Sequence, residues 1–199
     1  MERSEGERRA ARRPADQPEL ERKRLSALPA SQRDNEEIKM IDVTLICVGK
    51  LKEKFYQEAA AEYAKRLSAY CKLNIVELPE QKLPKKPTPG QIEAALEKEA
   101  NTIRARIPPS SRVIAMCIEG RLRSSEELPR MFPNLGYSKD KHLVFIIGGS
   151  YGLHPSIKAE AQFQLSMSPM TFPHHLARVM LLEQIYRAFK IQEGSDYHK

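Results

Sequence analysis

Apolar and polar positions divide the chain from Met40 onwards into alternating strand-like and helix-like segments. Ile41–Val48 is almost continuously apolar, as expected of a strand buried in a parallel sheet. The next segment instead repeats its apolar residues at helical spacing. Continued along the chain, the pattern predicts strands over residues 41–48, 73–78, 113–118, 143–147 and 164–166, and helices over 53–70, 88–107, 155–161 and 173–191.

Two short motifs mark expected helix starts. Thr88 can cap a helix whose first residue is Pro89, with Gln91 reaching back to complete a capping box. A basic, proline-broken loop over residues 81–87 precedes this motif. The run from Ser124 to Glu127 is a second capping signature and predicts a short helix after it.

Alternating strands and helices predict an α/β protein with a parallel-type sheet covered by helices on both faces. The last helix, 173–191, is apolar over much of its circumference. One apolar stripe would suffice to pack it on the sheet. The second stripe therefore indicates contact with a partner subunit. The stripes are Leu181, Leu182, Ile185, Ala188 and Phe189, and Leu176, Val179 and Met180.

Residues 1–39 differ in composition from the remainder. They hold ten Lys or Arg and nine Asp or Glu, without an aromatic residue. Such a segment buries too little apolar surface to offset its ordering entropy, so we predict a disordered, charged extension followed by one domain over residues 40–199. We expect either that Met40 is the natural start or that residues 1–39 are a dispensable extension. A transit peptide is a weaker alternative because those are poor in acidic residues.

Charge and cysteine content narrow the functional classes. The formal net charge of +7 favours an anionic partner, with nucleic acid the first candidate. Three scattered cysteines without metal-ligand spacing indicate a reducing compartment. The chain has no secretory signal and no apolar stretch of the ~20 residues that a membrane span needs. We therefore expect a cytoplasmic protein with no membrane and no metal partner. His174 and His175 diverge by about 100° on a helix and cannot easily chelate one ion.

Three motifs near the end of the chain carry the chemistry. An apolar strand runs into the glycine turn Gly148-Gly149-Ser150, a common place for a nucleotide-like ligand in an α/β protein. A second loop precedes the last helix, and the chain stops at Tyr197-His198-Lys199. A phenol, an imidazole and an ammonium serve acid–base work and phosphate binding. The combination indicates a compact transferase.

These motifs resemble those of the RlmH family, which belongs to the SPOUT class of RNA methyltransferases. The resemblance covers essentially all of residues 40–199 and rests on four segments in the family's order. They are Ile147-Gly148-Gly149-Ser150, Met170-Thr171-Phe172-Pro173-His174, Leu182-Glu183-Gln184-Ile185-Tyr186-Arg187-Ala188-Phe189 and Tyr197-His198-Lys199.

The resemblance implies a SPOUT-type α/β/α single domain with a deep C-terminal trefoil knot, which periodicity alone does not predict. It implies S-adenosyl-L-methionine as cofactor and a homodimer with its pockets near the subunit interface. The implied reaction is methylation of N3 of a pseudouridine in large-subunit ribosomal RNA, on the assembled ribosome. Two alternatives stay open: a non-catalytic ribosome-binding factor that retains the knotted fold, and a methyltransferase with another target such as transfer RNA.

Carried onto this sequence, the resemblance places three segments around the cofactor. Glycines allow close backbone approach and positive φ, and methionines can sandwich a ring. Two positions depart from the family: a methionine replaces the usual leucine at the end of the third strand, and a proline stands in the cofactor loop. The expected cofactor residues are Met116, Gly148, Met167, Ser168, Pro169, Met170, Thr171 and Phe172.

The same resemblance assigns the catalytic groups to the tail. His198 is the candidate base for the N3 proton, because an imidazole with a pKa of about 6.5 is partly neutral near pH 7. Tyr197 would stack on or hydrogen-bond the target base, and Lys199 would hold a phosphate. A mechanism without a base, in which basic groups only lower the N3 pKa, stays open. So does the question of whether the tail serves its own pocket or its partner's.

Eight basic residues are candidates for contact with RNA phosphates: Lys50, Lys52, Lys54, Lys82, Lys85, Lys86, Arg121 and Arg123. Lys50, Lys52, Arg121 and Arg123 are favoured, because they follow the predicted carboxyl ends of strands. On the last helix, Arg178 and Arg187 could serve the cofactor, the RNA or the dimer interface, with Glu183 as their ion-pair partner.

Overall fold

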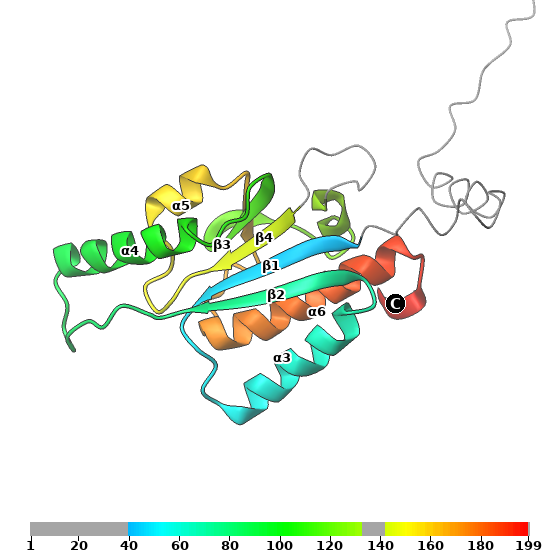
Figure 1. Ribbon diagram of the computed structural model, residues 1–199, viewed down its shortest axis with the longest axis horizontal. Helices are drawn as coiled ribbons and strands as arrows, with labels where there is room; N and C mark the ends of the chain where they lie inside the picture. Colours follow the sequence, from blue (N-terminus) through cyan, green and yellow to red (C-terminus); the bar gives the residue numbers. More distant parts are fainter. Residues whose placement is uncertain (1–39, 133–141, 199) are drawn as a thin grey trace, which may run out of the picture. The chain divides into compact units, whose positions relative to one another are not determined.

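Five strands form one parallel sheet in the computed structural model, which describes residues 40–132 and 142–198 (Figure 1). Their order across the sheet is β2-β1-β4-β3-β5, and every pairing is parallel, which confirms the predicted sheet. The predicted extension over residues 1–39 and Lys199 lie outside the described residues. The strands are β1 (Ile41–Val48), β2 (Cys71–Leu78), β3 (Ser111–Leu122), β4 (His142–Ile147) and β5 (Phe163–Ser166).

Helices cover both faces of this sheet, as predicted. Figure 1 shows α3 and α6 together on one face and α4 and α5 on the other. Two short 3-10 helices, η2 (Leu128–Met131) and η3 (Asp196–His198), follow β3 and α6. No helix in the described part of the chain is long and apolar enough to cross a membrane. The helices are α3 (Lys54–Leu67), α4 (Pro89–Arg104), α5 (Pro155–Glu160) and α6 (His174–Gln192).

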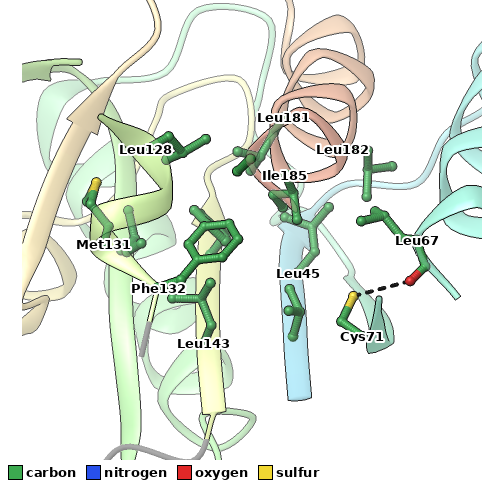
Figure 2. Close-up of a cluster of buried hydrophobic side chains, with 14 of the residues drawn as sticks. Leu45, Leu67, Cys71, Leu128, Met131, Phe132, Leu143, Leu181, Leu182 and Ile185 are labelled. Carbon is green, nitrogen blue, oxygen red and sulfur yellow. Dashed lines mark hydrogen bonds between the residues drawn. The ribbon is translucent and has the colours of Figure 1, made fainter. Parts of the chain in front are cut away.

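The larger hydrophobic core lies between the sheet and the α3–α6 layer. In Figure 2, Leu45 of β1 lies below Ile185 and Leu182 of α6, and Leu143 of β4 lies beside Phe132; the four aliphatic side chains are fully buried. Each such side chain contributes roughly 1.5–3 kcal/mol of burial free energy. A second cluster on the opposite face packs the sheet against α4 and α5. The two cores fix the carboxyl ends of the strands, where the candidate site forms.

The capping box at α4 is confirmed. Gln91 N–H donates to the Thr88 hydroxyl at 3.3 Å, and Thr88 N–H donates to the Gln91 side chain at 2.9 Å. The prediction for the second signature is only partly right. The Glu127 carboxylate accepts from Ser124 N–H at 3.0 Å, but Glu127 itself stands at the N-cap of η2. The result is a turn and a single 3-10 turn in place of an α-helix.

Some predicted boundaries are wrong. α3 ends at Leu67 instead of residue 70, and α4 ends at Arg104 instead of residue 107. β3 continues to Leu122, four residues beyond the prediction. An irregularity between Met116 and Arg121 lets it resume pairing with β5, a long-range contact that local hydrophobicity does not encode.

Candidate active site

A cavity of about 720 Å³ opens at the carboxyl ends of β3, β4 and β5. Its walls are the end of β3, the glycine turn after β4, the loop between β5 and α6, and the first turn of α6. Parallel α/β sheets bind ligands at this edge, and the volume suits a molecule of cofactor size. The lining is mostly apolar, with backbone amides and a few polar side chains at the rim.

The glycine turn after β4 is a tight structure closed on itself. Gly152 N–H donates to the Gly149 carbonyl at 3.0 Å, and Gly152 has a φ of 79°. A Cβ on Gly148 would lie 2.2 Å from the Gly152 carbonyl oxygen. The expected positive φ is therefore at Gly152, and Gly148 is required for close backbone packing.

Glu80, just after β2, holds this turn from outside. Ser150 N–H donates to the Glu80 carboxylate at 2.7 Å, and a Cβ on Gly149 would lie 2.8 Å from the same oxygen. Burial acts to raise the pKa of Glu80, but the hydrogen bonds from Ser150 outweigh it and hold this pKa below its usual range. Sequence reasoning missed Glu80, because the contact spans 70 residues and no motif surrounds it.

The loop between β5 and α6 is fastened by its serines. The Ser166 hydroxyl donates to the Ser168 carbonyl, and Met170 N–H donates to the Ser168 hydroxyl, each at 3.0 Å. Met170 is 70% exposed at the cavity mouth. Of the eight predicted cofactor residues, Pro169 is not among the lining residues, so its place in the loop does not put it at the cavity wall. The lining includes Met116, Gly148, Met167, Ser168, Met170, Thr171 and Phe172.

The rim nearest β3 and α5 carries charged groups that the sequence did not single out. The Lys158 ammonium forms an ion pair with Glu119, and this hydrogen bond lowers the pKa of Glu119. Cys117 lies beside them in β3. These residues come together only because α5 packs against the extended part of β3.

His174 and His175 begin α6, and their rings are 4.0 Å apart. His174 lines the cavity, and burial lowers its pKa, with His175 adding to the shift. His175 instead approaches the Glu53 carboxylate at 3.3 Å. Across the residues described, no group of three or more His, Cys, Asp or Glu could hold a metal ion.

The predicted catalytic tail lies at the opposite end of α6. The Arg187 guanidinium sits over the Tyr197 ring at 4.8 Å and donates to its carbonyl at 3.2 Å. Burial raises the pKa of the Tyr197 phenol, which stays protonated near neutral pH. The Tyr197 hydroxyl also donates to the Glu183 carboxylate at 3.5 Å, so the tail folds back onto the second half of α6. Thirteen helical steps separate Arg187 from His174, or about 20 Å at ~1.5 Å per residue. Tyr197 is not among the residues that line the cavity of the same chain. The backbone of His198 closes η3.

The predicted RNA contacts fall in different settings. Lys50 and Lys52 are exposed just beyond β1. Arg121 is exposed inside β3, which corrects the expectation that it follows the strand. Arg123 does follow it, and pairs with Glu127 at 3.1 Å.

Arg178 and Arg187 both have internal partners. Arg178 is 1% exposed, donates to the Gly49 carbonyl at 2.8 Å and forms an ion pair with Glu77. It therefore fixes α6 to the ends of β1 and β2, and does not face a ligand. Glu183 pairs with Arg187 at 2.6 Å, so only one of the two arginines has the predicted partner.

Comparison with known proteins places this arrangement in a family. The family described as "Predicted SPOUT methyltransferase" matches residues 41–198. The chain belongs to the SPOUT methyltransferases. Within them, it is 48% identical over 159 residues to ribosomal RNA large subunit methyltransferase H of Clostridium acetobutylicum, covering 80% of this chain and 100% of that protein. The protein of the same name from Clostridium novyi is 47% identical with the same coverage.

These relatives confirm the RlmH family membership that the motifs indicated. Among solved structures, the SpoU methyltransferase AviRb from Streptomyces viridochromogenes, in complex with AdoMet, matches with a TM-score of 0.40 and 13% identity. That match covers 84% of this chain and 64% of AviRb.

Proposed function

We propose that this protein is an S-adenosyl-L-methionine-dependent methyltransferase that modifies N3 of a pseudouridine in large-subunit ribosomal RNA on the assembled ribosome. One observation carries the proposal: seven of the eight residues expected to hold the cofactor line one cavity at the carboxyl edge of the sheet. The membership in the RlmH family supports methylation of large-subunit ribosomal RNA as the reaction.

The cavity fits such a cofactor by size and by the groups it offers. The backbone of the glycine turn can approach an adenosine closely at Gly152, because nothing lies within 4 Å of the Cβ that this residue lacks. Met116 and Met170 offer apolar faces, and backbone groups of residues 167–172 offer donors and acceptors. When bound, the cofactor supplies a methyl group on a sulfonium. The chain's task is to hold it, exclude water and align the target base.

N3 of the target base is a poor nucleophile while protonated, so the tail must accept the N3 proton or stabilise the resulting anion. His198 accepts this proton. Tyr197, with its raised pKa, is a phenol that stacks on the base or donates to it. Because Tyr197 packs against Glu183 and Arg187 and does not line its own cavity, the tail of one subunit serves the cavity of its partner. Lys199 then holds a phosphate next to the same base.

A homodimer is required if the tail of one subunit serves the cavity of the other. The second stripe of α6, Leu176, Val179 and Met180, is only half-buried in the protomer. Ile118 and Leu122 of β3 are each 54% exposed. Apolar surface of this kind favours a partner subunit. The protein acts in the cytoplasm, where assembled ribosomes are found.

The methyltransferase domain comprises residues 40–199 and contains the family's C-terminal trefoil knot. The topology supports the knot: β5 pairs with β3 at the sheet edge, yet α6, the next element, returns to pack on α3. A crystal structure would refute the knot if its chain path could be drawn out into a straight line by pulling the two ends apart.

The direct test is methyl transfer from radiolabelled S-adenosyl-L-methionine to intact ribosomes, separated subunits and free ribosomal RNA. We expect label in large-subunit RNA of intact ribosomes, with His198→Ala strongly impaired. Label retained by His198→Ala would keep the enzyme and reject the base. No label and no cofactor binding would indicate a non-catalytic ribosome-binding factor.

The use of the partner's tail is tested by mixing two inactive variants. His198→Ala has an intact cavity, and Gly148→Ala has an intact tail. A mixed dimer joins the intact cavity of one subunit to the intact tail of the other, so activity should return on subunit exchange. If each tail serves its own cavity, mixing restores nothing.

A further inference from the structure

Three lysines stand close together on the loop between β2 and α4. Lys82, Lys85 and Lys86 are all exposed, and none has an ion-pair partner among the residues that the structure describes. Figure 1 shows this segment, residues 79–88, projecting at the end of the molecule where β2 finishes. We call it the lysine loop. The one carboxylate in the lysine loop, that of Glu80, accepts a hydrogen bond from Ser150 N–H.

The lysine loop is fixed to the domain at both ends and in its middle. Gln81 N–H donates at 2.7 Å to Glu99, which is only 7% exposed on α4. At the other end, Thr88 is held in the α4 capping box. Between them, Leu83 is half-buried in a small pocket beside Tyr151 of the glycine turn. The lysines therefore project from a constrained backbone and not from a free tail.

Further positive charge adjoins this loop. Gly49 N–H donates to the Leu78 carbonyl at 2.8 Å, so the segment that follows β1 starts beside the segment that follows β2. Lys50 and Lys52 are exposed on that first segment. Both segments leave the sheet at its carboxyl edge, the edge that holds the cavity.

We propose that the lysine loop is a docking surface for backbone phosphates of the RNA substrate. The inference rests on the proposed function and adds a contact region outside the reacting site. Ammonium groups on flexible stems bind phosphates as point charges and do not read bases. Residues 79–88 contain no aromatic side chain, so the loop itself offers charge and no platform on which an unpaired base could stack. The loop therefore contributes affinity and orientation, independent of sequence.

The link through Glu80 determines where a docked phosphate lies relative to the cavity. Glu80 begins the lysine loop and accepts from Ser150 in the glycine turn that walls the cavity. A phosphate held by the loop is thus placed at a defined position relative to the cavity. The loop acts on binding of the RNA and leaves the cofactor and the transfer step alone.

The test compares two triple variants of equal charge in the full-length protein. The loop variant is Lys82→Gln, Lys85→Gln and Lys86→Gln. The control is Lys65→Gln, Lys72→Gln and Arg106→Gln. These three exposed cations lie at or near the amino-terminal ends of the strands, at the end of the sheet opposite the cavity. Binding to unmodified intact ribosomes is measured between 50 and 200 mM KCl at constant magnesium, together with KM, kcat and cofactor affinity.

For the loop variant, the slope of log affinity against log salt should fall by about 2–3, since each phosphate contact contributes roughly 0.7–0.9. The expected KM rises at least tenfold, while kcat and cofactor affinity stay within twofold of wild type. The control should keep a slope near that of wild type.

Equal slopes for the loop variant and wild type, in an enzyme that methylates ribosomes, would overturn the inference alone. Equal losses in both triple variants would also overturn it, because net charge would then explain the effect. A wild-type protein that neither binds nor methylates ribosomes would overturn the proposed function and this inference together.

Discussion

Replacing Gly148 by alanine tests how the cavity is built. The added Cβ would lie 2.2 Å from the Gly152 carbonyl oxygen and 2.9 Å from Leu153 N. Real Cβ contacts are essentially never below 3.0 Å, so backbone must move by roughly 1 Å. Neither neighbour is the end of a flexible side chain, and the turn is already closed by the hydrogen bond from Gly152 to Gly149.

The expected cost follows from that displacement. Overpacking of this kind destabilises a protein by about 1–3 kcal/mol. For a domain of this size that corresponds to a fall in Tm of roughly 2–10 °C. Because the displaced turn is also a cavity wall, cofactor affinity should fall at least tenfold. A misplacement of about 1 Å is enough to cost ~100-fold in rate.

Scanning calorimetry gives the Tm, titration calorimetry the cofactor affinity, and the ribosome assay the rate. Gly90→Ala is the matched control: nothing lies within 4 Å of its added Cβ, and it begins a helix. That variant should be neutral or slightly more stable. A Gly148→Ala protein with wild-type Tm and cofactor affinity would refute the packing argument.

Three further predictions concern buried groups. Arg178→Ala should lower the free energy of unfolding in urea by about 2–3 kcal/mol. This is less than the ~3–5 kcal/mol lost when a fully buried ion pair is broken, because Glu77 is partly exposed to solvent. An unfolding midpoint equal to that of wild type would contradict this. Burial lowers the pKa of His174 below 6.5, so the folded state binds fewer protons and stability falls as pH drops from 6.5 toward the folded pKa. His174→Gln should flatten that dependence in unfolding curves at pH 7.5 and 5.5, and an unchanged slope would argue against it. Iodoacetamide should label Cys117 at the cavity before Cys47, whose pKa burial raises to about 12, and cofactor should protect Cys117; peptide mass spectrometry decides the order.

Local signals in the sequence were enough for the scaffold. The continuous apolar run of β1 and the capping box at Thr88 both depend on neighbours a few residues away. Long-range pairing was not accessible in this way. β3 extends to Leu122 only because β5 resumes pairing beyond the irregularity at Met116. Local sequence signals likewise failed after Ser124, where the expected α-helix is a single 3-10 turn.

The residues of the candidate site also fall into two groups, those marked by local sequence motifs and those brought in by long-range contacts. The motif residues Gly148 and Met170 were predictable, since their neighbours in sequence also line the cavity. Glu80 and Lys158 were not, because each reaches the site through a fold contact with a distant segment. The role of Gly148 was not predictable either, because the Gly152 carbonyl fills the space of its missing side chain only in the folded turn.

The geometry of α6 connects these findings to the assembly. Its amino end carries His174 into the cavity, and Arg178 locks that end to the sheet. Its second half holds Tyr197 against Arg187, which lies about 20 Å from His174 along the helix. In the proposed mechanism, a single subunit supplies the cofactor wall of one site and the tail of another. That mechanism requires a dimer, and an obligate monomer with full activity would contradict it.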